Sequence, residues 1–283
     1  MIGLLVLGLK TAAWWLTGSS ALYSDALETV VNVAASVIAL IAIRFAARPA
    51  DKNHPYGHEK AEFFAAVIEG VLIILAALSI LQRAWTHLNS AAELEAPWTG
   101  LLLNVVATGF NGGWAALLGR AAKRYRSAAL GADSRHLWSD VATSLAVVAG
   151  VAIAVWTGLL WLDPLLAAGV AAYVLWSGMD LMRESVGGLM DAAPAETVVT
   201  RIRETVGQHA DGALEAHDLR MRHAGRQTFL EFHLVVPGDM RVAEAHAICD
   251  RVEAALKAEV EGLVITIHVE PEGKAKHSGV VVL

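Results

Sequence analysis

The chain has 283 residues, of which 55% are hydrophobic and 18% are charged, and its mean hydropathy is +0.49. Soluble domains carry about 25% charged residues, so this chain is too apolar to be wholly soluble. The net charge of −6 argues against nucleic-acid binding, and a single cysteine, Cys249, excludes a disulfide framework and a four-thiolate zinc site. The eleven histidines are therefore the residues whose chemistry needs an explanation.

Composition divides the chain near residue 190. All nine tryptophans lie before this point, the last being Trp176, whereas charged residues are denser after it. We therefore predict an α-helical membrane domain over 1–190 and a soluble domain over 191–283.

The first part contains six apolar runs of the length that a membrane span needs, about 20 residues. They are 1–18, 22–46, 61–86, 98–120, 129–156 and 160–182. The first run is short and contains Lys10, so a secretory signal is the alternative interpretation. Because Lys10 lies within the run and Trp14-Trp15 is typical of a membrane interface, we expect a span whose N-terminal end is missing from this chain.

Basic residues indicate the orientation of these spans. They gather in the loops 44–60 and 120–126, which lie on one side of the predicted membrane domain. The positive-inside rule places both loops in the cytoplasm. Six spans then place both termini, and the soluble domain, in the cytoplasm.

The soluble part shows the pattern of an α+β domain with the order α-β-β-α-β. Its expected elements are a helix over 195–208, strands over 214–223 and 227–236, a helix over 241–258 and a strand over 263–270.

Two of the predicted spans carry polar residues on one helix face. Asp25, Glu28 and Asn32 recur at i, i+3 and i+7, and His136 and Asp140 are at i, i+4. Ionisable residues at membrane depth usually face a pathway or a partner. The last four of these residues offer nitrogen and oxygen ligands for a divalent transition metal. The alternative is that all five are helix-end residues or make hydrogen bonds between helices.

A second candidate site lies in the first basic loop. Asp51, His54 and His58 fall within eight residues and could supply three metal ligands. The alternative is a cytoplasmic turn with solvated histidines, since Pro55 and Gly57 favour a turn.

A third candidate site lies in the soluble part. His217 and His233 belong to the first two strands, His246 to a helix, and His268 and Glu270 to one face of the last strand. These five residues could form a binuclear metal site, and scattered surface histidines are the alternative.

Five segments resemble the cation diffusion facilitator family, in particular its bacterial zinc/iron efflux members. The segment 48–62, RPADKNHPYGHEKAE, is a highly specific signature. The others are WWLTGSSAL from Trp14, ADSRHLWSD from Ala132, AHDLR from Ala216 and IHVEP from Ile267. They occur in the family's order and cover essentially the whole chain.

The resemblance implies three metal regions in a homodimer whose tail is metallochaperone-like. The transport site maps onto Glu28, Asn32, His136 and Asp140, the loop site onto Asp51, His54 and His58, and the cytoplasmic site onto His217, His233, His246, His268 and Glu270. It also implies a salt bridge at the dimer waist between Lys60 and Asp191.

The chain departs from the family pattern at two ligand positions. The family usually has His or Asp at the position of Glu28 and Asp at the position of Asn32. The amide of Asn32 carries no charge, which weakens the attraction for a dication. Asp25, one turn earlier on the same face, is then an extra candidate ligand.

The resemblance implies an efflux transporter of the bacterial inner membrane that exchanges a divalent metal for protons by alternating access. Imidazole favours Zn²⁺, Fe²⁺ or Co²⁺ over Mg²⁺ and Ca²⁺. We expect Zn²⁺ first, as substrate and regulatory ligand, with Cd²⁺, Fe²⁺, Co²⁺ and Mn²⁺ behind it.

The expected partners are metal ions, protons, lipid and a second copy of the chain, and no nucleic acid. The alternative is a membrane-anchored metal sensor or binding protein that does not transport. An enzyme is not expected, because the sequence has no Ser/His/Asp arrangement and no phosphate-binding glycine-rich loop.

Overall fold

A computed structural model describes the chain except residues 1, 89–94, 126–127, 226, 277–278 and 282–283. Contacts divide it into two units, which we describe separately. The helical unit comprises residues 1–40 and 65–182, and the tail unit comprises residues 41–64 and 183–283.

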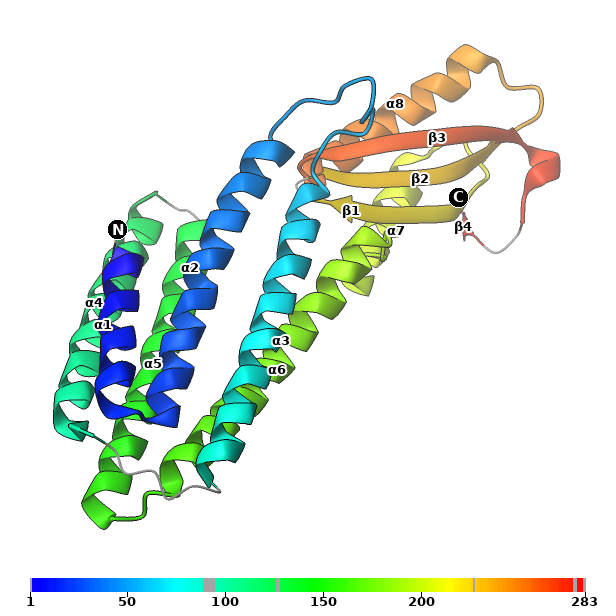
Figure 1. Cartoon of the computed structure of the whole chain (residues 1–283). Coiled ribbons are helices and arrows are strands. Elements are labelled where there is room, and N and C mark those ends of the chain that lie inside the picture. Colours follow the sequence, from blue (N-terminus) through cyan, green and yellow to red (C-terminus); the bar gives the residue numbers. More distant parts are fainter. Residues whose placement is uncertain (1, 89–94, 126–127, 226, 277–278, 282–283) are drawn as a thin grey trace. The chain divides into compact units, whose positions relative to one another are not determined.

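Six long helices account for the apolar part of the chain (Figure 1). They are α1 (Ile2–Thr17), α2 (Ser20–Ala46), α3 (Ala61–Leu88), α4 (Pro97–Tyr125), α5 (Ala128–Thr157) and α6 (Leu162–Leu189). Five of them are long and apolar enough to cross a membrane, and α1 is a shorter apolar helix. The structure confirms the six predicted helices, with bounds that differ by a few residues.

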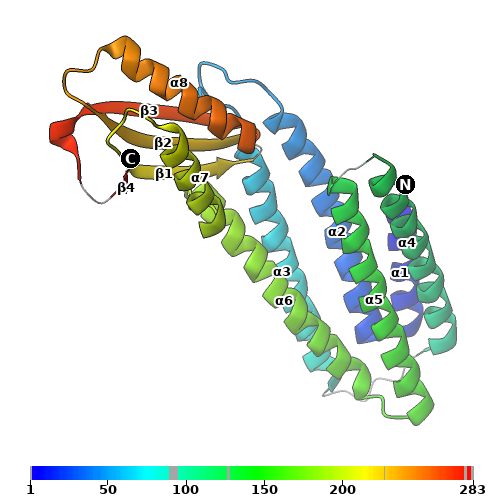
Figure 2. The ribbon, with the colours of Figure 1, turned by 180° about the vertical axis from the view of Figure 1, so that it is seen from behind.

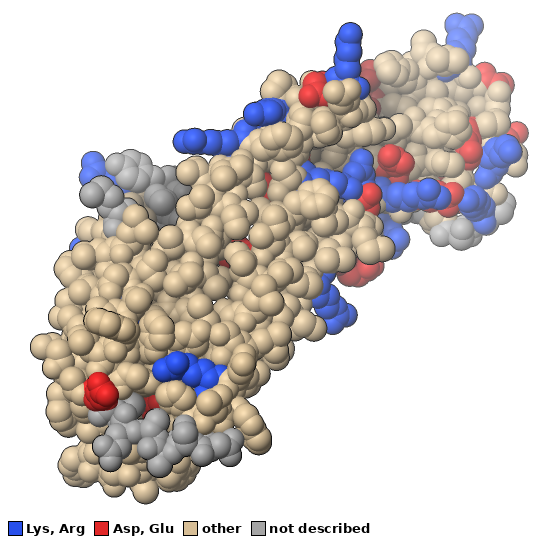
Figure 3. Space-filling model, in the orientation of Figure 1, with Lys and Arg blue, Asp and Glu red and all other residues tan. Residues whose placement is uncertain are grey.

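Small and branched apolar side chains hold the helical unit together. Around α1, α2, α4 and α5 the core includes Ala13, Leu22, Leu101, Val147 and Val151. Large apolar side chains elsewhere in the unit are exposed, and the face seen in Figure 3 is nearly free of charge. Exposed apolar surface of this extent is what contact with lipid requires.

Helices α3 and α6 lie side by side in both views (Figures 1 and 2). Gly70 of α3 and Gly178 of α6 permit a close approach, because a Cβ on Gly70 would lie 3.3 Å from the carbonyl oxygen of Gly178. A Cβ on Gly178 would lie only 2.6 Å from Cγ2 of Ile73. Small residues at such a crossing are typical of helix packing in membranes.

The tail unit contains the remaining elements. They are α7 (Glu196–His209), β1 (Glu215–Ala224), β2 (Gln227–Val236), α8 (Val242–Glu259), β3 (Leu263–Pro271), the 3₁₀ helix η1 (Glu272–Lys274) and β4 (Val280–Val281). The predicted order α-β-β-α-β is confirmed, and β4 is an addition that the sequence did not predict.

The strands form one sheet in the order β3-β2-β1-β4. Strand β2 runs antiparallel to β1 and parallel to β3. Helices α7 and α8 cover one face of this sheet (Figure 2), where Ile202, Leu230, Phe232, Leu234 and Val252 form the core. Alternate residues of each strand therefore point to the opposite face.

Candidate metal sites

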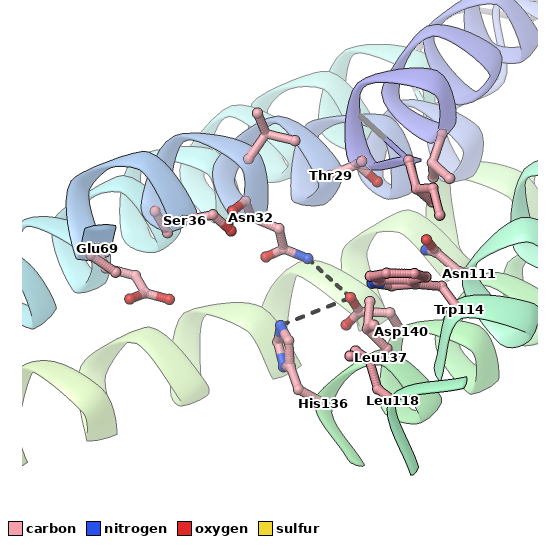
Figure 4. Close-up of a pocket in the computed structure, with 16 residues that line it drawn as sticks. Thr29, Asn32, Ser36, Glu69, Asn111, Trp114, Leu118, His136, Leu137 and Asp140 are labelled. Atoms are coloured by element: carbon pink, nitrogen blue, oxygen red, sulfur yellow. Dashed lines mark hydrogen bonds and ion pairs between the residues drawn. The ribbon is translucent and has the colours of Figure 1, made fainter. Parts of the chain in front are cut away.

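The polar residues of α2 and α5 meet inside the helical unit. The Asn32 amide nitrogen donates a hydrogen bond to Oδ2 of Asp140 at 3.1 Å. Nε2 of His136 lies 3.9 Å from the same oxygen (Figure 4). Asp140 is buried, whereas 64% of the His136 side chain is exposed. The i, i+4 spacing on α5 thus places an imidazole and a carboxylate together, as the sequence indicates.

Two cavities adjoin these residues. The larger, of about 410 Å³, is lined by Asn32, His136 and Asp140, together with Glu69 of α3. The smaller, of about 120 Å³, has the same four residues and also Glu28 in its lining. The four residues that the sequence grouped as a transport site therefore line one cavity, and their donor atoms suit a divalent transition metal.

Glu69 is a residue that sequence reasoning missed. The predicted span 61–86 contains one other acid, Glu62, which lies two turns earlier, and no polar residue lies one turn from Glu69. Helical spacing therefore gave no signal for it. The sequence nevertheless contained one indication of its importance, because an ionisable residue within a membrane span is by default a candidate functional residue.

Asp25 lies on the same helix as Glu28 but is engaged elsewhere. Lys10 Nζ donates to its Oδ1 at 2.8 Å, and Ser144 Oγ donates to the same oxygen at 2.7 Å. Asn104 Nδ2 donates to Oδ2 at 2.6 Å. Both carboxylate oxygens are therefore occupied, and Asp25 is absent from the lining of both cavities.

The loop before α3 brings together the three residues predicted there. Asp51 Oδ1 lies 3.3 Å from Nδ1 of His54, and Oδ2 lies 3.4 Å from Nε2 of His58. Their donor atoms lie within 4.8 Å of one another. Asp51 accepts backbone N–H bonds from Asn53 and His54 at 2.8 Å, and the bond from His54 holds the pKa of Asp51 below its ordinary value. The loop therefore holds an ionised carboxylate beside two imidazoles, which is a suitable donor set for a metal ion.

The tail cluster is built by strand register on the face that α7 and α8 leave uncovered. His217 of β1 pairs with His233 of β2, which pairs with His268 of β3. The rings stand in one row, with centroids 5.3 Å and 5.0 Å apart. Glu270 lies 3.4 Å from Nε2 of His217 and 3.3 Å from Nδ1 of His233. Both of these nitrogens are buried without a hydrogen bond, so the cluster offers donors that the protein itself does not satisfy.

A bulge adds Asp218 to this cluster. The register of β1 shifts between His217 and Arg220, and Asp218 adopts a positive φ of 54°. A donor atom of Asp218 comes within 4.8 Å of donors of His217 and His233. Strict strand alternation would place Asp218 on the other face, so the sequence could not predict it.

His246 is not brought into this cluster. It lies on α8, which covers the opposite face of the sheet, and 75% of its side chain is exposed. Its Nε2 lies 3.6 Å from Asp250 on the same helix. Within one chain, the predicted five-residue set is therefore reduced to His217, His233, His268 and Glu270.

Lys60 and Asp191 meet in the tail unit. Lys60 Nζ lies 2.8 Å from Oδ1 of Asp191, and Arg222 Nη1 lies 3.3 Å from the same oxygen. The hydrogen bond from Lys60 is the main cause that lowers the pKa of Asp191. The side chains of Lys60 and Asp191 are 34% and 45% exposed, so this pair is a partly solvated ion pair.

Comparison with known proteins covers both parts of the chain. The cation efflux transmembrane domain matches residues 1–190, and the cytoplasmic domain of cation efflux proteins matches residues 194–272. The chain is 43% identical over 268 residues to sll1263 of Synechocystis sp. (strain ATCC 27184 / PCC 6803 / Kazusa), described as an uncharacterized transporter, covering 95% of this chain and 86% of that protein. It is 31% identical over 271 residues to the cation-efflux pump FieF of Cronobacter sakazakii, covering 96% and 90%.

Among solved structures, the zinc form of CzrB, described as a candidate zinc transporter, is 52% identical to the matched part. The match covers 30% of this chain and 96% of that chain, with a TM-score of 0.29.

Proposed function

The chain belongs to the cation diffusion facilitator family and is thus an integral membrane cation efflux transporter, and we propose that its substrate is Zn²⁺. We further propose that it exports Zn²⁺ in exchange for protons. The observation that carries this proposal is the cavity that Glu28, Asn32, His136 and Asp140 line together. An imidazole with oxygen donors favours zinc over magnesium and calcium, whose sites are built from oxygen alone. Cd²⁺, Fe²⁺, Co²⁺ and Mn²⁺ are the competing substrates.

The exchange follows from ligand chemistry. An imidazole and a carboxylate must lose their protons before they bind a metal ion, so binding releases protons. When the cavity opens to the other side, protons that return to His136 and to a carboxylate expel the metal. Metal and protons then move in opposite directions, provided that the two openings alternate.

The loop and the tail supply the regulatory sites in this proposal. Asp51, His54 and His58 form the loop site, and His217, His233, His268 and Glu270 form the tail site. Metal that binds only the folded, dimeric state stabilises that state in proportion to its occupancy. We infer a homodimer in the bacterial inner membrane with both termini in the cytoplasm, an orientation that rests on the basic loops at 44–60 and 120–126.

Transport into proteoliposomes with recorded internal pH tests the proposal. Asp140→Ala should abolish zinc flux while the protein remains folded, because it removes a buried ligand. His136→Ala should lose flux together with the linked proton movement. Normal zinc flux in Asp140→Ala would refute the site. Zinc binding without flux in the unmodified protein would favour the alternative, a membrane-anchored metal sensor.

A further inference from the structure

Glu69 is the charged residue that the transport site, as assigned above, leaves unused. It lies on α3, a helix that contributes none of the four proposed ligands, and it lines both cavities with His136 and Asp140. Figure 4 shows that the side chains of Glu69, Asn32 and His136 line the same pocket. A carboxylate in a membrane helix is costly unless it has a function or a partner.

The acids that are fully buried in the helical unit, Asp25, Asp140 and Asp163, accept hydrogen bonds from neighbouring residues. Asp25 is bound by Lys10, Asn104 and Ser144, and Asp163 accepts hydrogen bonds from residues at the start of α2. Glu69 and the proposed ligand Glu28 are partly buried, and neither makes a hydrogen bond or ion pair with any residue that the structure describes. Helix packing therefore does not account for the charge of Glu69, and the cavity is the place where that charge acts.

Glu69 and His136 line the same two cavities. Glu69 and His136 each lie about two turns from the start of their helices, α3 and α5, which run in the same direction. Asp140 lies one turn further along α5, and Asn32 bonds to it there. Glu28 lines only the smaller cavity. A cation in either cavity would thus have Glu69 and His136 beside it.

We propose that Glu69 is a metal-attracting residue of the transport pathway, which supplies the negative charge that Asn32 does not carry. This inference rests on the proposed function. The smaller cavity then contains three carboxylates, from Glu28, Glu69 and Asp140, as many as it would have with Asp at position 32 in place of Glu69. Opposite charges at short range in a poorly solvated cavity interact far more strongly than they do in water.

The test is zinc flux as a function of zinc concentration in proteoliposomes. Glu69→Gln keeps the shape of the side chain and removes its charge. We expect the KM for zinc to rise about tenfold, with the maximal rate nearly unchanged, because attraction to the cavity is lost and the transport step is retained. Asp180→Asn, which removes an exposed acid of α6 outside both cavities, is the matched control and should leave the KM unchanged.

Two further variants separate charge from packing. Glu69→Asp should keep a KM near that of the unmodified protein. Asn32→Asp combined with Glu69→Gln should restore most of the lost affinity, because the charge returns at a neighbouring position. An unchanged KM in Glu69→Gln, an equal defect in Glu69→Asp, or no recovery in the double variant would overturn the inference.

Asp140→Ala, measured beside these variants, separates the two levels of the argument. If it is inactive while Glu69→Gln behaves as the unmodified protein, only the role of Glu69 is lost. If it transports zinc normally, the proposed transport site itself is wrong.

Discussion

Lys10 is buried in the middle of α1, and its neighbours explain how a lysine is accommodated in this apolar helix. Its Nζ donates to Asp25 Oδ1 and to Ser144 Oγ, both at 2.8 Å, and both charged side chains are only 2% exposed. The pair therefore joins α1, α2 and α5. A charge in a membrane span is tolerated when a neighbouring helix neutralises it.

Removal of Lys10 should destabilise the helical unit. Lys10→Met leaves the Asp25 carboxylate buried without its cation, and disruption of one side of such a pair costs about 3–5 kcal/mol. Lys10→Met combined with Asp25→Asn should recover much of the loss, because no unpaired charge remains. Thermal unfolding of the detergent-purified protein measures both effects, with the exposed Lys123→Met as control. Equal melting temperatures for Lys10→Met and the control would contradict this assignment.

At the scale of the elements, the sheet of the tail unit shows what the sequence could and could not predict. Alternation correctly placed His268 and Glu270 on one face of β3. The register of the strands could not be predicted from the sequence, because it depends on pairing between distant segments. This register aligns His217, His233 and His268 in one row. The helix with His246 was also predicted, but the face of the sheet that it covers was not.

The same limit applies to the membrane helices. Helical spacing grouped Glu28 with Asn32 and His136 with Asp140, because polar residues one turn apart leave a signal within one segment. The place of Glu69 beside the cavities and the pairing of Asp25 with Lys10 depend on which helices become neighbours, and the spacing of residues within one helix carries no information on this. The sequence thus predicted pairs within elements better than groups formed between elements.

The histidine row leads to a prediction for zinc binding by the full-length protein. Zn²⁺ should raise the melting temperature of the tail unit, and His233→Ala combined with His268→Ala should remove most of this shift. The fold should persist, because both residues lie on the face opposite the core. His209→Ala, in α7 and outside the row, is the control. Calorimetry that gives the same zinc stoichiometry for the double variant and the unmodified protein would refute the proposed ligands.

At the scale of the whole molecule, the tail unit contains more than the last third of the chain. It includes residues 41–64, with the ends of α2 and α3 and the loop of His54 and His58, and the end of α6. The ion pair of Lys60 with Asp191 joins two of these segments, since Lys60 immediately precedes α3 and Asp191 follows α6. Arg222 of β1 contacts the same carboxylate. One acidic side chain therefore connects the segments that enter and leave the membrane helices with the sheet.

We expect the stability of the proposed dimer to depend more strongly on Asp191 than on Lys60 or Arg222. Asp191→Ala leaves Lys60 and Arg222 near each other without an anion, whereas Arg222→Ala leaves the closer pair, at 2.8 Å, intact. An exposed pair contributes about 0–1 kcal/mol, so we expect Lys60→Ala and Arg222→Ala each to have a small effect and Asp191→Ala a larger one. The swap of Lys60→Asp with Asp191→Lys should recover only part of the loss, because the new lysine would face Arg222.

A double-mutant cycle on detergent-purified protein, with dimer dissociation on dilution as the readout, measures this coupling. The pKa of Asp191 is lowered in the folded protein, so its contribution is fully present above the ordinary carboxyl pKa of about 4 and is lost as the pH falls through the lower folded value. The coupling should therefore stay constant across the neutral range and disappear only under strongly acidic conditions. A coupling that weakens between about pH 6 and pH 8 would contradict this prediction, because the lowered pKa keeps Asp191 ionised throughout that range. A coupling of zero at neutral pH would reduce Lys60, Asp191 and Arg222 to independent surface charges.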